Sequence, residues 1–459
     1  MLLGVLMPVL PIDTGRYGTK EMKLIFEEEH RLQRMLDVEA ALAWAHAEVG
    51  DIPREDAENI MKRASTRHVK LKRVKEVERH IKHDLASIVR VLAEQSGSSS
   101  AYVHLGATSY DIVDTANALL LRDALELIEQ KLDCLEEILI EKADKYKRTI
   151  MAGRTHGQHA LPTTLGFKFA VWMRETARNL QRLRQCRRRL IVGKMTGAVG
   201  TQAGLGRHAV KIQELVMKKL EIEPADISTQ IVQRDRHAEM VCVFAINASS
   251  LDNIATEIRE LQRPEIAELF EAFEHKKQVG SSTMPHKRNP EICERICGLA
   301  KVLRGLVAPS LENIVTWHER DLTQSSSERF IIPEACILLD YILFLAIDVL
   351  TNLHVDTDRM RVNLEITKGR IMSEAIMTAL FQKGMNRQEA HELLRKLTTK
   401  SILEDRPFKE ILAESKEVCK FLTERDTAKA LDPENYLGTA VKQVDAAIWK
   451  TCREREIKV

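Results

Sequence analysis

The chain has 459 residues, with 69 Lys and Arg against 67 Asp and Glu, so its formal net charge is only +2. This length allows two to four domains, and the near-neutral charge gives no bulk field directed at nucleic acid or a membrane surface. Charged residues make up 30% of the chain and aromatic residues 5%, a balance that favours long solvated helices over a β-sandwich.

Neither the N-terminus nor the cysteines indicate export from the cell. The apolar run from Leu2 to Leu6 has no basic segment before it, and Pro8 soon interrupts it, so we expect no signal peptide. The eight cysteines form no CxxC motif, which predicts buried thiols in a reducing cytosol and no zinc site. The chain is therefore expected to be cytoplasmic. We also see no ligand cluster that would demand a metal ion or an organic cofactor.

The first regular element is a helix predicted over residues 21–50, with Leu36, Ala40 and Ala47 on one face. Before it stands Gly15-Arg16-Tyr17-Gly18. This tetrapeptide can be an ordinary turn with a solvated arginine. Alternatively, Arg16 can grip a phosphate, with Tyr17 adding a hydroxyl or a ring face.

A basic helical segment over residues 67–90 carries His83 and Asp84, and a Gly/Ser linker over 96–100 follows it. The next string, residues 103–109, contains His104 and ends in Thr108 and Ser109 at the start of a long helix. The two hydroxyls can cap that helix, or its free N–H groups and hydroxyls can bind a carboxylate.

The apolar spacing predicts an all-α fold built on an elongated bundle. Heptad seams run from Leu121 to Leu139, from Val241 to Ile258 and from Ile292 to Leu306, and no sustained strand alternation is visible. The apolar stretch 331–350 contains Pro333 and two aspartates, so it predicts a buried bundle helix and no membrane span. We expect three helical domains, 1–105, 106–351 and 352–459, with the long helices in the second.

Residues 154–164, Arg-Thr-His-Gly-Gln-His-Ala-Leu-Pro-Thr-Thr, interrupt the helical pattern and predict a bent loop or broken helix. His156 within it can be structural or chemical. The arginine-rich helix over 174–189 lacks aromatic interleaving, so a solvated face is expected and no nucleic-acid partner. Gln230, Arg320, Ser325 and Arg329 stand in polar stretches, where capping or plain surface charge would explain them.

Residues 280–290, Gly-Ser-Ser-Thr-Met-Pro-His-Lys-Arg-Asn-Pro, form a polar loop that its glycine and prolines keep from becoming helical. Such a loop can close over a small anion. The string closely resembles the signature loop of the fumarase/aspartase superfamily, and with residues 154–164 it is most similar to the adenylosuccinate lyases within it. That resemblance extends in order from about residue 15 to the end of the chain.

The resemblance implies β-elimination that releases fumarate from a succinylated purine nucleotide. It implies His156 as the general acid, Ser281 as the base with Ser282 as its nearest competitor, Lys287 as a stabilising charge and Glu294 as the partner that orients the imidazole. Substrate contacts are implied for Arg16, Tyr17, His83, Asp84, His104, Thr108, Ser109, Thr155, Gln230, Ser282, Met284, Asn289, Arg320, Ser325 and Arg329.

These roles suit the chemistry. Elimination across a C–N bond needs a base, a fixed positive charge for the developing dianion and an acid for the departing nitrogen. A serine hydroxyl is far too weak a base unless Ser281 is dehydrated near the Lys287 ammonium. Imidazole donates protons readily near neutrality, which suits His156. Glu294 can alternatively be an ordinary first-turn glutamate facing water.

The resemblance further implies a homotetramer with shared active sites whose central helices pack together. The rivals are another superfamily lyase, such as an argininosuccinate lyase or a carboxymuconate cycloisomerase, and a catalytically silent helical scaffold. The Arg16-Tyr17 pair and the set Arg320, Ser325 and Arg329 argue against the small-acid enzymes, since only a nucleotide brings a phosphate to hold.

Overall fold

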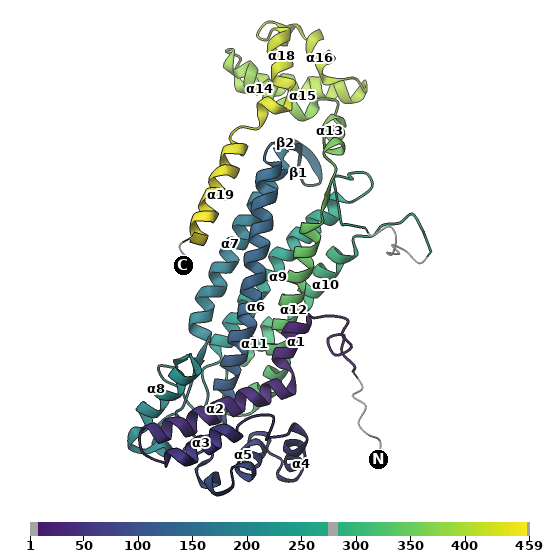
Figure 1. The fold of residues 1–459 in the computed structure, drawn as a ribbon. Coiled ribbons are helices and arrows are strands. Elements are labelled where there is room, and N and C mark those ends of the chain that lie inside the picture. The colour runs from purple at the N-terminus through teal and green to yellow at the C-terminus, as the bar shows by residue number, and fades with distance from the viewer. Residues whose placement is uncertain (1–7, 274–282, 457–459) are drawn as a thin grey trace. The chain divides into compact units, whose positions relative to one another are not determined.

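The computed structural model describes residues 8–273 and 283–456, and most of them are helical (Figure 1). The all-α prediction is confirmed. The described residues also include one hairpin and two pairs of two-residue strands.

The N-terminal helices are more finely divided than the sequence pattern predicts. The predicted helix over 21–50 is two helices, α1 (Lys20–Phe26) and α2 (Glu28–Glu48), because Glu27 between them has an extended backbone. After α3 (Arg54–Arg63), the predicted segment 67–90 contains α4 (Leu71–Ile81) and the start of α5 (Asp84–Ser96). His83 separates them as the N-cap of α5, and its Nδ1 accepts the Ala86 N–H at 3.3 Å.

The expected Gly/Ser linker is also ordered. Residues Gly97–Tyr102 form the 3₁₀ helix η1. The Asn59 amide of α3 donates to the Ser96 carbonyl at 2.8 Å, and Ser99 donates to Asp56 at 2.7 Å. These side-chain hydrogen bonds hold in place a segment whose glycine- and serine-rich sequence has little helical preference by itself.

The long helices carry the predicted seams. They are α6 (Ser109–Tyr146), α7 (Leu165–Leu190), α9 (Asp235–Leu261), α10 (Glu291–Gly305) and α12 (Thr323–Thr351). Each seam position of α6 from Leu121 to Leu139 is buried, as is each one of α9 from Val241 to Ile258. In α10 the seam positions Ile296, Leu299 and Leu303 are buried, whereas Ile292 and Leu306 are only partly buried.

Helix α12 is, within the described ranges, the one helix long and apolar enough to cross a membrane. Of its most apolar 18-residue window, 67% is buried inside the protein. Asp340 in its middle is fully buried and accepts hydrogen bonds from Thr19 and Lys131. This is the behaviour of a core helix, as its interrupting proline and acids predict.

The chain divides into two compact units, each made of three segments. Unit 1 comprises Met1–Asp133, Asn179–Leu251 and Ile296–Leu345, and unit 2 comprises Cys134–Arg178, Asp252–Arg295 and Ala346–Val459. Most of the boundaries fall inside long helices, whereas the three expected domains are consecutive. The division at 105/106 and 351/352 stays a prediction.

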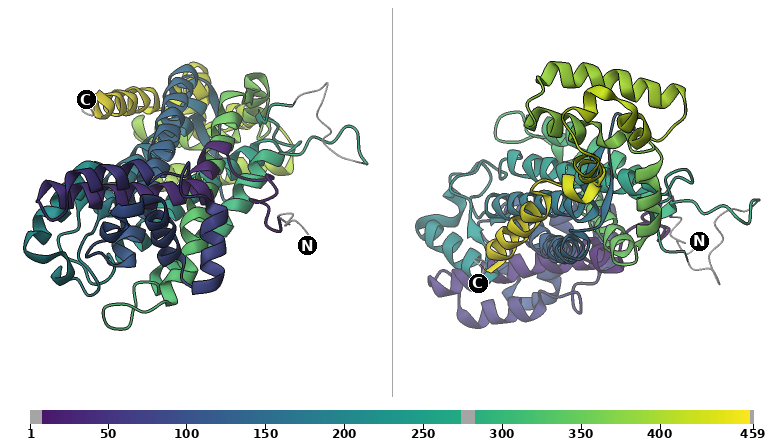
Figure 2. Two further views of the ribbon diagram at one scale, coloured as in Figure 1. Left: turned by 60° about the horizontal axis from the view of Figure 1, so that its bottom comes forward. Right: turned by 90° about the horizontal axis from the view of Figure 1, so that it is seen from above.

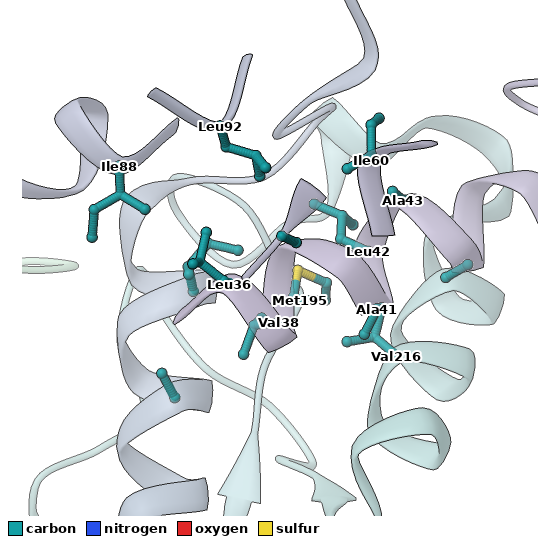
Figure 3. Packing of buried hydrophobic residues seen from close by; sticks show 14 of the residues in the cluster. Leu36, Val38, Ala41, Leu42, Ala43, Ile60, Ile88, Leu92, Met195 and Val216 are labelled. Atoms are coloured by element: carbon teal, nitrogen blue, oxygen red, sulfur yellow. The ribbon is translucent and has the colours of Figure 1, made fainter. Parts of the chain in front are cut away.

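In unit 1 the helices α2 to α5 and α8 (Ala209–Leu220) share a core with the first turns of α6 (Figure 3). Leu36 and Leu42 of α2, Ile60 of α3 and Leu92 of α5 are at most 1% exposed within it. Figure 2 shows the purple and dark-blue helices α2 to α5 grouped together. The remaining elements of the unit are β3 (Val192–Gly193) parallel to β4 (Glu223–Pro224), η2 (Ala203–His208) and α11 (Val307–Glu312).

Unit 2 contains the hairpin β1 (Ile150–Thr155) and β2 (Gln158–Thr164), and the antiparallel pair β5 (Leu269–Phe270) and β6 (His354–Val355). Its C-terminal elements are α13 (Thr357–Glu365), η3 (Arg370–Met372), α14 (Ser373–Gln382), α15 (Arg387–Leu403), α16 (Phe408–Glu414), α17 (Lys416–Cys419), α18 (Glu424–Leu431), η4 (Pro433–Tyr436) and α19 (Ala440–Glu456). Helices α14 to α18 share a small core around the fully buried Phe408.

The hairpin corrects the prediction of a bent loop or broken helix over 154–164. Thr155 pairs with Gln158, which leaves His156 and Gly157 as a two-residue turn with φ of 54° and 73°. Two positive φ values are what a type I′ turn requires, and this turn matches the twist of antiparallel strands. The glycine supplies one of them without steric cost, and His156 adopts the other.

None of the eight cysteines is joined in a disulfide. Cys186, Cys293, Cys297 and Cys336 are buried as expected, whereas Cys134 and Cys419 are exposed, so the expectation of buried thiols is only partly met.

Candidate active site

Unit 1 contains a cleft of about 570 Å³ at the starts of α5, α6 and α12. Six of the predicted substrate-contact residues line it: His83, Asp84, Ser109, Arg320, Ser325 and Arg329. They come from three separate stretches of sequence, and the helix starts bring their polar groups to one cavity. Arg31 of α2 also lines it, and burial, reinforced by the nearby Arg329 guanidinium, lowers the pKa of Arg31.

Arg320 is the most distinctive cation of this cleft. Its guanidinium lies over the Tyr110 ring, 3.5 Å from the centroid, and its Nη1 donates to Gln230 Oε1 at 2.8 Å. Gln230 is fixed in turn, since its Nε2 donates to the Ala198 carbonyl at 2.8 Å. Tyr110 donates from its hydroxyl to Ser325 at 2.8 Å. Within the described part of the chain Arg320 has no carboxylate at salt-bridge distance, and its Nε is buried without a partner, so its charge is held in place and available to an anion.

Arg329 differs from Arg320, because it is already paired. Its Nη2 lies 2.7 Å from Asp84 Oδ2, and both side chains are about half exposed. An exposed pair of this kind contributes little to stability and is easily exchanged for another anion. His83 stands beside this pair, with its Nδ1 3.5 Å from Asp84.

The start of α6 is organised by a buried acid. Asp111 Oδ2 accepts the Thr108 N–H at 2.8 Å, and Oδ1 accepts the Thr196 N–H at 2.8 Å and pairs with the fully buried Lys194. Thr108 thus occupies the N-cap position next to Ser109, with its own N–H satisfied from within the first turn. Both readings of this pair, helix cap and carboxylate site, remain compatible with the geometry.

His104 lies outside the lining of the cleft and has its own acidic partner. Its Nδ1 is 2.7 Å from Oε1 of Glu39, which is 1% exposed. Burial by itself would lower the pKa of His104, but the charge and hydrogen bond of Glu39 outweigh burial and raise that pKa above its ordinary value of 6.5. Arg16 and Tyr17 do not line the cleft either, and Tyr17 packs on Tyr341 of α12 with ring centroids 5.9 Å apart.

In unit 2, Thr155 and His156 are exposed at the end of the hairpin. The left-handed backbone of His156 is imposed by the two-residue turn, which directs the imidazole outward from strands that are otherwise held by packing. Ala152 at the base of β1 is 1% exposed and packs against Leu364, Ile371 and Met372.

The signature segment is described only from Thr283 onward, so the predictions for Ser281 and Ser282 lie outside the described residues. Met284 and Lys287 are exposed and Asn289 is partly buried. Glu294 is exposed in the first turn of α10, as the alternative reading of an ordinary first-turn glutamate expects. Its role toward His156 stays a prediction.

Among the described residues, no group of three or more His, Cys, Asp or Glu side chains is arranged to hold a metal ion. The cleft is lined by carboxylates such as Asp84 and Glu328 and by the guanidinium groups of Arg31, Arg320 and Arg329, and guanidinium groups bind phosphate and carboxylate.

Known proteins resemble this chain over nearly its whole length. The family model described as "Lyase" matches residues 15–305, and the one described as "Adenylosuccinate lyase C-terminus" matches residues 369–447. The adenylosuccinate lyase of Pyrococcus horikoshii is 53% identical over 442 residues, which cover 96% of this chain and 98% of the relative. That of Methanocaldococcus jannaschii is 49% identical over 454 residues, covering 99% and 98%. The chain belongs to the adenylosuccinate lyase family.

As a member of that family, the chain is a lyase enzyme. Its fold is shared more widely in the superfamily. The 3-carboxy-cis,cis-muconate lactonizing enzyme of Pseudomonas putida aligns with a TM-score of 0.89 and 33% identity, covering 97% of this chain and 99% of that one. The helical bundle is thus common to proteins with different reactions, and the side chains of the site must distinguish them.

Sequence reasoning missed the buried network behind the cleft of this adenylosuccinate lyase family member. Arg234 is 2% exposed and pairs with Asp114 at 2.9 Å and Glu328 at 2.6 Å. Burial raises the pKa of Glu328, although Arg234 opposes this, and burial with the Arg234 charge lowers the pKa of His237 to about 3. In the string Arg-Asp-Arg-His at 234–237, no local pattern marks which arginine becomes buried.

Tyr110 was also missed. It directly follows Ser109 and supports both Arg320 and Ser325. Its position in the string Thr-Ser-Tyr, between two predicted binding residues and a helix, was the one available signal.

Proposed function

We propose that this enzyme cleaves adenylosuccinate to AMP and fumarate, and performs the same β-elimination on the succinylated aminoimidazole carboxamide ribotide of purine biosynthesis. The observation that carries the proposal is the full-length identity of about 50% to adenylosuccinate lyases, which includes the family's own C-terminal region. The cleft supports it, because Arg320, which has no carboxylate of residues 8–273 and 283–456 at salt-bridge distance, suits a nucleotide phosphate.

The proposed reaction uses groups of this chain and requires no cofactor. Ser281, with Ser282 as the alternative, removes the proton beside the carboxylate. Lys287 and Asn289 hold the carboxylate as negative charge develops on it. His156 protonates the departing nitrogen, and Glu294 orients the imidazole. An exposed turn position suits His156 for this role, since the imidazole can meet a substrate without first breaking a packed contact.

For the nucleotide we propose Arg320, Ser325 and Arg329 as the phosphate-binding set, with Gln230 in contact with the substrate. Arg320 is held by the Tyr110 ring, so little side-chain entropy is lost when it binds an anion. Arg329 exchanges its exposed Asp84 partner for the substrate. Arg16, Tyr17, His83, His104, Thr108, Ser109, Thr155 and Met284 complete the proposed contacts.

We also propose a cytoplasmic homotetramer whose protomers share active sites. Unit 1 exposes large apolar side chains along α12 and the segment before it, including Trp317 at 76%, Leu322 at 67% and Phe330 at 64%. Contact with a second copy would remove these apolar side chains from water. Arg16 and Tyr17 do not line the cleft of their own chain. With active sites shared between protomers, they can contribute to the cleft of a second copy.

The decisive experiment is a substrate panel. Purified protein is mixed with adenylosuccinate, argininosuccinate and carboxymuconate in parallel, and fumarate or lactone is followed. Fumarate from adenylosuccinate alone is the expected result. Lactone formation would favour the second candidate, a cycloisomerase, which is considered because of the structural likeness to the Pseudomonas putida enzyme. No turnover on any substrate would indicate a silent scaffold.

The variant Arg320→Met sharpens this test. Loss of one charge-assisted contact to phosphate costs about 1.5–3 kcal/mol, so kcat/KM for adenylosuccinate should fall roughly 10- to 150-fold. The exposed Arg425, far along the sequence on α18, provides a matched control as Arg425→Met. Equal kcat/KM in the two variants would remove Arg320 from the phosphate site.

A further inference from the structure

Asp340 is a fully buried acid of helix α12 that the proposed chemistry does not use. It accepts hydrogen bonds from two helices of unit 1 that are distant from it in sequence. The Thr19 hydroxyl at the start of α1 donates to its Oδ2 at 2.5 Å, and the Lys131 ammonium of α6 donates to its Oδ1. A buried carboxylate is costly unless it is well partnered, so these contacts fix the start of α1 against α12.

Thr19 also begins α1. It is the N-cap residue of that helix, and its Oγ1 accepts the Met22 N–H at 3.3 Å. A threonine hydroxyl can accept one hydrogen bond and donate another, so this single group caps the helix and binds the buried acid. The start of α1 and its attachment to α12 therefore depend on the same side chain.

The two residues before this cap lie on the same face of α12. The Tyr17 ring packs on Tyr341, with the ring centroids 5.9 Å apart. At Gly18 an added Cβ would lie 2.7 Å from Ile337 Cγ2, and φ is 94°, so this position favours glycine on both counts. Ile337 and Tyr341 are one helical turn apart on either side of the buried acid, so the contacts form one continuous attachment to the helix.

Arg16 stands at the outer end of this attached segment. The backbone before it is folded into turns, in which the N–H groups of Arg16 and Tyr17 donate to the Pro11 carbonyl at 3.0 and 3.3 Å. The Arg16 side chain is exposed, and no carboxylate of the described ranges lies at salt-bridge distance from its guanidinium. A guanidinium that is carried on a fixed backbone and is not already paired is suited to bind an anion.

We propose that Asp340 is a positioning residue for the lyase reaction: by holding Thr19, it sets the place from which Arg16 reaches the substrate phosphate. The inference rests on the proposed function for the phosphate contact of Arg16. It applies to whichever protomer's site Arg16 enters, because Asp340 acts on the backbone of its own chain. A fixed cation loses little freedom on binding, so release of the segment should weaken phosphate binding and leave the chemical step nearly unchanged.

The kinetic test uses Asp340→Asn and Thr19→Val. Asparagine keeps the volume but loses the charge and one acceptor, whereas valine keeps the shape but loses the hydroxyl. Each variant should raise KM for adenylosuccinate roughly 10- to 150-fold, the range for loss of one charge-assisted contact, with kcat changed less than about threefold. The fold should survive Asp340→Asn, because the Lys131 side chain is 21% exposed and its ammonium can reach water.

The variant Arg16→Met decides whether Asp340 acts through Arg16. Its rise in KM sets the ceiling for the two variants above. In the Arg16→Met background, Asp340→Asn should raise KM by no more than about twofold further, since the contact that it would weaken is already gone. Losses that multiply in the double variant would overturn the proposal.

Two controls are matched to these variants. Thr19→Ser keeps both the cap and the hydroxyl that binds Asp340, so its KM should equal that of the parent. Glu136→Gln changes another buried acid, which is 2% exposed on α6 and pairs with Arg455 at 3.0 Å, and its KM should also equal that of the parent. An equal rise in KM in Glu136→Gln would overturn the specific role of Asp340.

Binding and amide hydrogen exchange separate this role from the proposed function, because neither requires turnover. In calorimetry, Asp340→Asn should weaken AMP binding roughly 10- to 150-fold and leave adenosine binding within about twofold, since adenosine has no phosphate. Equal weakening of both ligands would overturn the proposal.

Amide exchange in residues 10–26 should be faster in Asp340→Asn and Thr19→Val than in the parent, and unchanged in Glu136→Gln. Unchanged exchange in the first two variants would show that Asp340 does not hold the segment. A parent enzyme that binds AMP but does not cleave adenylosuccinate would overturn the proposed function, whereas the binding and exchange measurements would still decide the role of Asp340.

Discussion

Replacing His156 by asparagine separates the chemistry of this residue from its place in the turn. His156 is the first residue of a two-residue turn with φ of 54°, and it is exposed. Asparagine followed by glycine is the sequence that type I′ turns prefer, so His156→Asn keeps the backbone while removing the imidazole. The free energy of unfolding should therefore stay within about 0.5 kcal/mol of the parent.

The activity should respond very differently. A general acid contributes about 10²- to 10⁴-fold, which corresponds to roughly 2.7–5.4 kcal/mol in activation free energy at 1.36 kcal/mol per tenfold. We expect kcat for adenylosuccinate to fall by that factor in His156→Asn, measured from fumarate release. As a contrast, His156→Val should also lose about 1–2 kcal/mol of stability, because a β-branched side chain is disfavoured at positive φ.

Two outcomes would refute this reasoning. Activity of His156→Asn within tenfold of the parent would remove the general-acid assignment. A loss of more than about 1 kcal/mol of stability, measured by urea unfolding, would show that the turn depends on the imidazole and that the backbone argument is incorrect.

Two further predictions concern buried charge. Arg234→Met should lower the free energy of unfolding by about 3–5 kcal/mol, because it leaves Asp114 and Glu328 buried without their cation. A loss below about 1 kcal/mol, measured by urea unfolding, would contradict the buried network. The pKa of His104 is raised in the folded state, so this residue contributes stability that is fully present below about pH 6.5 and is lost as the pH rises through the folded-state pKa. Glu39→Gln should remove that contribution. If the difference in unfolding free energy between about pH 5.5 and about pH 8.5 is the same in Glu39→Gln as in the parent, the His104–Glu39 pair is not its source.

Some of the site could be foreseen because its signals are local. The helix starts at Ser109 and Glu291 follow from capping and turn residues, and the seams of α6 and α9 follow from their spacing. The string at 154–164 singled out His156 as a candidate, but the bent loop or broken helix predicted there is a hairpin. The His-Gly turn signal was present, but Pro162 and the bulge between Ala152 and Arg154 break the strand alternation that would have revealed a hairpin.

What lay beyond prediction depends on pairs that are distant in sequence. Arg154 meets Glu268 at a separation of 114 residues, and Arg234 meets Glu328 at 94. Nothing in the neighbourhood of either acid distinguishes it from the many solvated glutamates of the chain, because burial of a charge becomes tolerable only once its partner has been delivered by the fold.

The sequence by itself determined the helical class, the positions of the long seams, the family and the set of candidate residues, because periodicity and motif order are properties of neighbouring residues. Only the tertiary structure decided three features of the described residues: Arg320 rests on Tyr110 with no described carboxylate at salt-bridge distance, His156 occupies a left-handed turn, and Asp340 holds the start of α1 on α12. Charge pairing and burial are set by groups brought together across long stretches of chain, and no local pattern encodes them.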